Sequence, residues 1–570
     1  MGRVHDRILK QRLSRRRLLA TAGTAAAGTA LVAACGGGGT PSPDATAAPG
    51  ASPTAGEEVI TKDGILHSSH TQVLPSLSLF GATALIPGLT FGFTVFDHLW
   101  YVPLDTQVIE LMLATNIENP DGEGLEIIVT IGDSFFHDKP PTNGRPVLAR
   151  DVKASYDAFA ADDLAPGGDW FRNIFDRVDA PDDHTVVIRQ QRPYAWVFHT
   201  AGAGSPVSSS ILPEETLPGS DYDLSQDLIG SGRMVITDSR SEKFILARHP
   251  NWRIPGEPFL AGIESSLISE PALRQAAFRA GDIDTVPLAN SLEADQMKAD
   301  LGDQVTISSE LSRAYTTLQL NLKLPAFQDL RVRKAIRLAI NRRGLIQGIE
   351  LDAEGGAPSG PVPPIQTAFK IPEEEEYFRF APEEARTLLE AAGFDFDKEF
   401  TLKFHTAGEE QQKLALLLQE QLGEVGIKIN IQGEDLLSVW LPRSLQTGDY
   451  EMTSYTQLPY DDPSFPLVFF TSHSALGVDE PRGRNNMDFF DDEITAAADA
   501  VDAELDGELR TELVKDAIRL IMEKEAPMIN LFSAVSFTGR RHWYKGWVTG
   551  RGSFGAFNGR NWIDTNIRGA

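Results

Sequence analysis

LSRAYTTLQLNLKLPAFQDLRVRKAIRLAIN, residues 311–341, predicts one strand, one turn and one helix. Residues 315–320 are rich in β-branched, aromatic and aliphatic side chains, which favour a strand. Pro325 ends that strand. Asp329 then stands where a helix N-cap belongs, because its carboxylate can accept from the free N–H groups of a first turn. We therefore expect a helix that begins near Asp329.

The helix expected after Asp329 has one apolar stripe. Its apolar residues recur at i, i+3, i+4, i+7 and i+8, namely Val332, Ala335, Ile336, Ala339 and Ile340. Burying a Val or Ile side chain is worth about 1.5–3 kcal/mol, so this helix is expected to pack against a sheet. The basic residues lie mainly off the stripe: Arg331, Arg333, Lys334 and Arg337.

Length and composition indicate an ordinary soluble chain of more than one domain. The 570 residues exceed what one simple core accommodates, which favours two or three domains. Hydrophobic residues make up 42% and charged residues 23% of the chain, as in globular proteins. The alternation of strand, helix and strand over residues 400–431 predicts a twisted, mainly parallel sheet flanked by helices. Residues 57–66 are expected to form a first strand, and residues 178–188 a hairpin.

Residues 1–34 are predicted to be an export signal and not part of the fold. A basic segment is followed by an uncharged stretch, residues 18–34, that is too short and too weakly apolar to span a membrane. Residues 14–19, SRRRLL, resemble a twin-arginine export motif, with a general secretory signal as the alternative. Val32-Ala33-Ala34-Cys35 resembles a lipobox, in which Cys35 would be acylated; the alternative is an uncleaved membrane anchor.

Residues 35–57 would then be an acylated cysteine followed by a flexible tether. The segment after Cys35 is Gly, Ala, Thr, Ser and Pro with few charges, so it has little to bury. A lipid on Cys35 would hold the folded part on the outer face of the cell membrane, in an extracellular or periplasmic location.

Charge and missing motifs exclude several function classes. Residues 1–34 hold seven basic residues and one acidic residue, so the rest of the chain carries a formal net charge of −34, against −28 for the whole. That acidity disfavours nucleic acid and anionic lipid as partners. The sequence has no G-x-S-x-G, Walker A, H-E-x-x-H or CxxC motif. We therefore expect no catalytic residues, no metal site and no cofactor.

Several motifs in a fixed order resemble one family. The pattern NxxxPxFxDxRVRxAIxxAIxR, beginning at Asn321, resembles a signature of extracytoplasmic solute-binding proteins of the ABC-importer peptide/nickel/opine family, family 5. Further likenesses lie in residues 144–152, 178–188, 381–394, 448–452 and 526–531. Ser78, Arg233 and Pro459 depart from the family's patterns, which weakens the case for a general oligopeptide ligand.

The resemblance implies an α/β, bilobal, periplasmic-binding-protein-like fold of the large class, with two lobes joined by crossing hinge strands. Lobe 1 would comprise residues 58–310 and 530–570, with an extra subdomain at about residues 99–212. Lobe 2 would comprise residues 315–528, and the hinges would lie near Tyr315 and Asn530.

The resemblance also implies a function without enzymatic activity. The protein would be a monomeric solute-binding lipoprotein that captures a peptide or similar small solute and delivers it to an ABC permease with its ATPase subunits. The candidate solute contacts are Asn321, Tyr455, Gln457, Tyr460, Asp461 and Asp462. The alternative is a surface-anchored hydrolase or a sensor-coupled receptor on the same scaffold.

Overall fold

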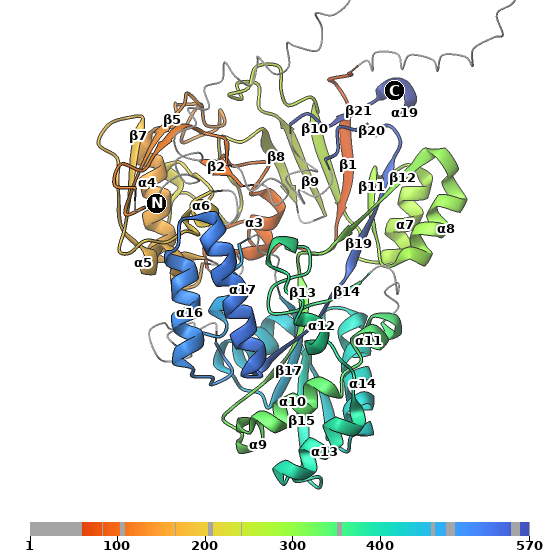
Figure 1. Ribbon diagram of the computed structural model, residues 1–570. Coiled ribbons are helices and arrows are strands. Elements are labelled where there is room, and N and C mark those ends of the chain that lie inside the picture. Colours follow the sequence, from red (N-terminus) through yellow and green to blue (C-terminus); the bar gives the residue numbers. More distant parts are fainter. Residues whose placement is uncertain are drawn as a thin grey trace, which may run out of the picture.

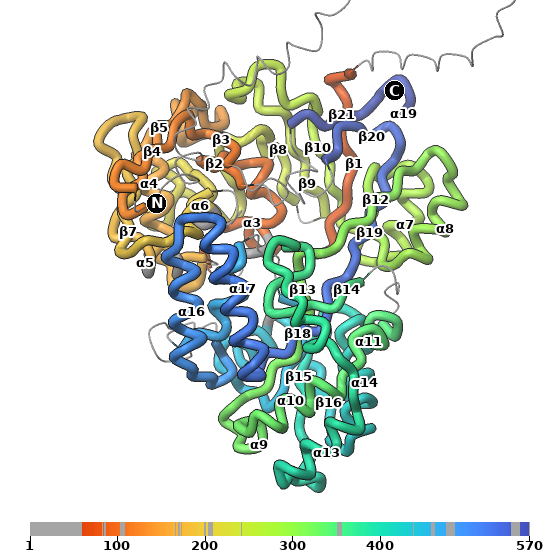
Figure 2. Tube along the Cα trace, in the orientation of Figure 1, coloured from red at the N-terminus to blue at the C-terminus, as the bar shows by residue number. Residues whose placement is uncertain are grey.

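The structure is a computed structural model in which the chain forms two lobes, one above the other in Figures 1 and 2. It describes residues 60–81, 84–102, 109–122, 124–165, 167–202, 209–240, 242–349, 356–457, 462–472, 474, 485–548 and 559–568. The upper lobe holds the N-terminal and C-terminal ends of the described chain, and the lower lobe holds the largest sheet. The predicted bilobal α/β architecture is confirmed.

Among the described residues, the upper, first lobe contains three sheets of three or four strands and two small two-stranded sheets. The first has the order β1 (Ile65–His70), β10 (Gly262–Leu267), β9 (Lys243–Arg248), β8 (Met234–Arg240). The second has the order β4 (Ala114–Glu118), β5 (Glu126–Ile131), β7 (Thr185–Gln190), β6 (Phe175–Asp179). The third has the order β11 (Thr285–Leu288), β19 (Val535–Arg541), β12 (Val305–Leu311), beside helices α7 (Pro271–Ala280) and α8 (Ser291–Leu301).

Two strand predictions for this lobe have different outcomes. The hairpin expected over residues 178–188 is confirmed by antiparallel β6 and β7. The first strand, expected over residues 57–66, begins later, because β1 spans Ile65–His70 and pairs in parallel with β10.

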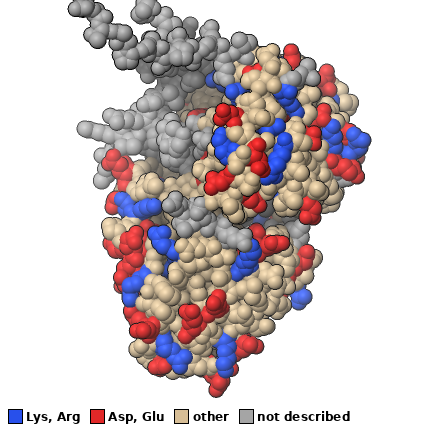
Figure 3. All heavy atoms as spheres, turned by 90° about the vertical axis from the view of Figure 1, so that its right-hand side faces the viewer, with Lys and Arg blue, Asp and Glu red and all other residues tan. Residues whose placement is uncertain are grey.

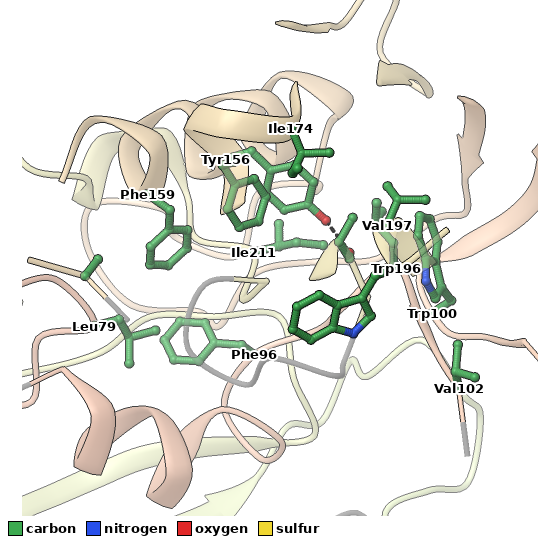
Figure 4. Close-up of a cluster of buried hydrophobic side chains, with 14 of the residues drawn as sticks. Leu79, Phe96, Trp100, Val102, Tyr156, Phe159, Ile174, Trp196, Val197 and Ile211 are labelled. Atoms are coloured by element: carbon green, nitrogen blue, oxygen red, sulfur yellow. Dashed lines mark hydrogen bonds between the residues drawn. The ribbon is translucent and has the colours of Figure 1, made fainter. Parts of the chain in front are cut away.

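A compact apolar core joins the second sheet to the helices beside it. Helices α4 (Ala149–Ala161) and α5 (Gly168–Ile174) contribute Tyr156, Phe159 and Ile174, which belong to the same buried cluster as Trp196 (Figure 4). The Tyr156 hydroxyl is fully buried and donates to the main-chain oxygen of Ala201 at 2.6 Å. This core is continuous with the buried cluster of the rest of the first lobe.

The lower, second lobe is built on a six-stranded sheet. Its order is β14 (Ala357–Pro358), β18 (Met528–Ser533), β13 (Tyr315–Leu320), β17 (Met452–Gln457), β15 (Glu399–His405), β16 (Lys428–Glu434). Its helices include α11 (Arg342–Gly348), α13 (Pro382–Ala392) and α14 (Glu409–Glu424).

The prediction of a mainly parallel sheet is wrong for the sheet as a whole. Only the β15–β16 and β15–β17 pairs are parallel, and the other three adjacent pairs are antiparallel. The α14 crossover produces the parallel β15–β16 pair, as the alternation predicted. Strand β13 enters from the first lobe and β18 returns to it, so these two strands run in opposite directions.

The opening stretch forms the elements expected of it. Strand β13 spans Tyr315–Leu320, and Asp329 caps helix α10 (Leu330–Leu338) by accepting from the N–H of Arg331. The turn before the cap holds one additional short helix, α9 (Pro325–Gln328). The stripe of α10 is buried in a core cluster with Leu318 and Leu320, which confirms the packing of this helix against the sheet.

Two chain segments cross between the lobes side by side. Strands β12 and β13 carry the chain into the second lobe, and β18 and β19 carry it back. β12 pairs with β19 in the first lobe, and β13 pairs with β18 in the second. Between these pairs, the N–H of Ser312 donates to the oxygen of Ala534 at 2.7 Å. The connection is therefore a two-stranded ribbon.

Three arginines from α10 and α11 hold the returning segment in place. Arg337 pairs with the Glu525 carboxylate through two hydrogen bonds of 2.7 and 2.6 Å. Arg333 donates to the main-chain oxygens of Lys524 and Glu525. Arg342 donates from Nε to the main-chain oxygen of Asn530 at 3.0 Å. All three side chains are buried, although two of them lie off the apolar stripe.

Helices α16 (Asp492–Ala503) and α17 (Gly507–Glu523) lie along the junction of the two lobes (Figure 1). Their apolar side chains, such as Val501 and Ile518, belong to the same buried cluster as the core of the first lobe. The N–H of Ala195 in the first lobe donates to the oxygen of Asp502 at 2.8 Å. This helix pair therefore packs against the first lobe. The predicted second lobe, residues 315–528, includes the pair, and that boundary remains a prediction.

Both ends of the described chain meet in the first lobe. Arg568, in the C-terminal helix α19 (Thr565–Arg568), donates to the main-chain oxygen of Ile65 at 2.8 Å and lies 2.6 Å from the His67 ring nitrogen. The buried Asp284 carboxylate accepts from the N–H of His67 and from the Trp543 indole, at 2.7 and 2.6 Å. The last residues thus brace the first strand.

The charged surface is mixed on the face seen in Figure 3, where acidic and basic side chains are interspersed among uncharged residues. In the part of the chain that the structure describes, no helix is both long enough and apolar enough to cross a bilayer.

We predict that Arg337→Leu lowers the free energy of unfolding of the solute-free protein by about 3–5 kcal/mol, because it leaves the Glu525 carboxylate buried without its charge partner. Urea unfolding at neutral pH measures the loss. The matched control is Arg331→Leu on the same helix, whose ion pair with Asp329 is exposed and is worth about 1 kcal/mol or less. Equal losses in the two variants would contradict the role of the buried pair.

Candidate functional site

The carboxyl ends of β15 and β17 meet the crossing strands at one edge of the six-stranded sheet. Gln457, the last residue of β17, pairs with Tyr315, the first residue of β13, directly below the ribbon. Ligands of open α/β sheets bind outside the carboxyl ends of parallel strands. This edge faces the first lobe, so it is the candidate site.

One face of the sheet at this edge is polar. Side chains alternate along each strand, and the residues on this face are Tyr315, Thr317 and Gln319 of β13, Thr453, Tyr455 and Gln457 of β17, and Met528 and Asn530 of β18. The opposite face carries Leu318, Leu320 and Met452, which are buried against α10. The sequence alternation therefore separates a core face from a polar face.

A hydrogen-bond network organises this polar face. The Tyr455 hydroxyl accepts from Gln319 at 3.2 Å and from Gln457 at 2.5 Å. Tyr450 donates to the Gln319 side-chain oxygen at 3.2 Å, and burial raises the pKa of Tyr450 well above its usual value. The Trp440 ring packs edge-on against Tyr455 with centroids 5.1 Å apart. Hydrogen bonding thus fixes the orientation of the phenol and both amides.

Tyr455 and Gln457, two of the predicted solute contacts, lie together in this network. Both are buried, with 6% and 4% of their surface exposed. Tyr460 and Asp461, predicted to lie in the loop that follows, fall outside the described residues, as does Cys35.

Asn321 lies at the other end of β13. Six strand residues separate it from the hinge edge, a span of roughly 20 Å. Its amide donates to the oxygens of Gly448 and Tyr450, each at 2.9 Å, and its side-chain oxygen accepts from the N–H of Lys323. It lines an open groove of about 300 Å³ at that end of the sheet. The structure does not bring Asn321 together with Tyr455 and Gln457.

Asp462 is engaged in a buried ion pair. Arg510 of α17 donates to both of its carboxylate oxygens, at 2.8 and 2.7 Å, and also to the Ser464 hydroxyl. The Asp462 side-chain oxygen also accepts from the N–H of Ser464 at the start of α15 (Ser464–Val468). Its carboxylate therefore orders the chain after β17, and its predicted contact with solute remains a prediction.

Asp502 on α16 lies near this pair, with 17% of its side chain exposed. Burial raises the pKa of Asp502 to about 6, although Ser464, Arg192 and Arg510 act in the opposite direction. Arg192 of the first lobe lies 3.9 Å from the Asp502 carboxylate. The contact between α16 and the first lobe therefore contains a carboxylate that titrates in a mildly acidic range.

Among the described residues, no three His, Cys, Asp or Glu side chains gather closely enough to hold a metal ion. The polar face presents amides, hydroxyls and phenols. This chemistry suits hydrogen bonding to a small polar molecule.

Two lobes joined by a ribbon, with a polar face at the crossing, are the architecture of a protein that binds a small molecule between its lobes. The sequence pattern of the bacterial extracellular solute-binding proteins, family 5 (middle region), matches residues 109–476. The chain belongs to this family, and it is a solute-binding protein of the ABC-importer type.

Two relatives and one solved structure illustrate the likeness. DdpA of Escherichia coli, named as a probable D,D-dipeptide-binding periplasmic protein, is 23% identical over 59% of this chain and 64% of its own length. Di/tripeptide-binding protein 2 of Pseudomonas aeruginosa is 24% identical over 67% of this chain and 72% of its own. The Escherichia coli murein tripeptide binding protein MppA has a TM-score of 0.73 at 20% identity, covering 89% of this chain and 99% of MppA.

The family assignment confirms the recognition made from the sequence motifs. None of these comparisons supports the alternative of a hydrolase or a sensor-coupled receptor. The sequence-based candidates include Tyr455 and Gln457 of this polar face but not Gln319, Tyr450 or Asn530, and the contact of Tyr455 and Gln457 with a solute remains a prediction. The alternation of β13 could have indicated Gln319, which lies between Leu318 and Leu320.

We predict that Asp502→Asn raises the free energy of unfolding at pH 7 by roughly 1–3 kcal/mol. The folded-state pKa of Asp502 is raised, so its charge destabilises the folded protein above that pKa. Below the unfolded-state pKa of about 4, both states are protonated and the gain should vanish. Urea unfolding of solute-free protein at pH 7 and pH 4 measures both effects.

The control for this prediction is Asp516→Asn on α17, an exposed carboxylate that should change stability by no more than about 0.5 kcal/mol at either pH. A lower stability of Asp502→Asn at pH 7 would show instead that the charged carboxylate is favourable where it lies.

Proposed function

We propose that this protein captures a short peptide, or a similar small solute, between its two lobes and delivers it to an ABC permease with its ATPase subunits. The observation that carries the proposal is the ordered polar face of amides and phenol at the hinge edge of the second lobe. Relatives named for dipeptide and di/tripeptide binding support a solute of that size. The protein acts as a monomer and has no enzymatic activity of its own.

Capture follows from motion about the ribbon. The chain between the two paired regions is short, residues 312–314 on one segment and Ala534 on the other, so a rotation there moves one lobe relative to the other. A solute favours the closed arrangement only as far as it binds that arrangement more tightly than the open one. Contacts to both lobes would provide this difference in affinity.

The proposal assigns the chain to two lobes and names the residues that contact the solute. Lobe 1 comprises residues 58–310 and 530–570, with the extra subdomain at about 99–212, and lobe 2 comprises residues 315–528. The solute contacts include Tyr455 and Gln457 from the polar face, and Tyr460, Asp461 and Asp462 from the chain that follows. Asn321 belongs with them only if a solute extends to the groove at the far end of β13.

We predict that gently purified protein retains a solute visible by native mass spectrometry, and that the stripped protein is stabilised by at least one member of a panel of dipeptides, tripeptides and opines. A solute at 100 times its dissociation constant should stabilise the folded state by about 2.7 kcal/mol, readily seen as a rise in Tm. Random tripeptide to pentapeptide pools should bind weakly or not at all, and micromolar calorimetric affinity for them would contradict this.

We also propose that the protein is an exported lipoprotein. Residues 1–34 are the signal, of twin-arginine type, and Cys35 carries the lipid at the start of the tether. The protein then lies on the outer face of the cell membrane, and its membrane contact is through the lipid.

We predict that Cys35→Ser moves the protein from the membrane fraction to the soluble fraction and abolishes incorporation of labelled fatty acid, because no other cysteine is present. Cell fractionation and labelling measure both. Arg15→Lys with Arg16→Lys serves as the comparison: it should block export while leaving Cys35 intact. Membrane association of the Cys35→Ser protein after export would contradict the lipid anchor.

A further inference from the structure

We propose that Asn530, on the strand that returns from the second lobe, binds an amide group of the solute, assisted by the hydroxyl of Ser533. This inference rests on the proposed function and identifies the chemical group of the solute that the site recognises. The inference starts from hydrogen-bonding groups that the fold buries without pairing them.

Asn530 is 1% exposed, yet neither its side-chain nitrogen nor its side-chain oxygen has a hydrogen-bond partner among the described residues. The Ser533 hydroxyl, three residues further along β18 and fully buried, also has no partner among the described residues. Buried polar groups are nearly always paired, because leaving one unpaired is unfavourable. Two such residues on one short strand therefore indicate groups kept for another partner.

The other buried asparagines in the described chain behave differently. Asn321, Asn485, Asn486 and Asn561 each donate from the side-chain amide to at least one main-chain oxygen. The fold therefore readily pairs a buried amide when the amide has a structural role. Asn530 is the exception in this set.

The main chain at Asn530 is held firmly. Arg342 donates to its oxygen at 3.0 Å, and the guanidinium is itself packed against the rings of Tyr377 and Phe378, each 5.4 Å from the ring centroid. On the other side, Asn530 pairs in register with Thr317 of β13. The amide is thus presented from a rigid strand, which reduces the entropy lost when it binds.

The location fits a solute contact. Met528, two residues earlier on the same face, touches Gln319 and Gln457 with its sulfur, at 3.4 and 3.8 Å from their amide nitrogens. Asn530 is the next residue on this face toward the ribbon, and it pairs with Thr317, which pairs on its other side with the predicted contact Tyr455. Its amide therefore lies where the polar face meets the crossing.

The chemistry of the side chain selects the solute group. A carboxamide donates through nitrogen and accepts through oxygen, so it can pair with the N–H and the carbonyl oxygen of one residue in an extended peptide, which point the same way, unlike the N–H and C=O of a single trans peptide unit. A carboxylate would satisfy only the donor, and a metal ion only the acceptor. The geometry therefore favours one residue of an extended peptide as the group bound at this edge.

The first test uses solute-stripped protein. Asn530→Leu removes an unpaired buried amide and keeps the side-chain size, so its Tm should equal or exceed that of the wild type. The matched control is Asn485→Leu, which removes an amide paired to the oxygens of Thr471 and Phe489 and should lower Tm. A Tm for Asn530→Leu lowered as far as in the control would overturn the proposal, whatever the solute is.

The second test uses calorimetry with alanyl-alanine and its depsipeptide alanyl-lactate, in the L,L and D,D forms. The ester lacks the N–H donor, so the wild type should prefer the dipeptide by about tenfold, as expected for one lost hydrogen bond with its partner left buried. Asn530→Leu should bind the dipeptide more weakly and lose that preference.

Equal affinity of the wild type for amide and ester, or a preference that survives in Asn530→Leu, would overturn the role of Asn530 while leaving the proposed function intact. Absence of binding to every probe, together with no retained solute, would overturn the proposed function and with it the amide contact.

Discussion

The second lobe depends on how buried guanidinium groups are satisfied. A guanidinium removed from water must find acceptors, and Arg333 and Arg337 find them on the Glu525 carboxylate and the main-chain oxygens of residues 524 and 525. Arg342 donates from Nε to Asn530, and its other two nitrogens have no partner among the described residues. The donors come from α10 and α11, which follow β13. The incoming and returning segments are therefore fixed to one helical frame, and they move as a unit with the second lobe.

That frame determines where the polar face can lie. Because β18 is held at its edge and β13 at its apolar face, the opposite face of both strands is left for hydrogen-bonding side chains. Amides and a phenol there orient one another, so each group points in a defined direction before a solute arrives. Specificity for the solute then depends on which donors and acceptors on this face have no partner within the protein.

Local patterns predicted the local elements well. The β-branched run predicted β13, and the cap and the stripe predicted α10. Partners that are distant in sequence leave no trace in such local patterns. Arg337 lies off the apolar stripe yet is buried, because its partner Glu525 lies 188 residues away, and the ion pair of Asp462 with Arg510 is equally invisible in the local sequence. Whether neighbouring strands run parallel or antiparallel likewise depends on how the chain passes between the lobes, and hydrophobic periodicity carries no information about that path.

The bracing of β1 by the C-terminal helix has a mechanical consequence. A pull on the N-terminal end of the folded chain acts on β1, which is held along its length by β10 and at its start by Arg568. Tension applied there is distributed through the first lobe and does not pass through the ribbon. Drag or stretching at the lipid attachment proposed for Cys35 would therefore place no load on the motion between the lobes, and the second lobe would remain the moving part.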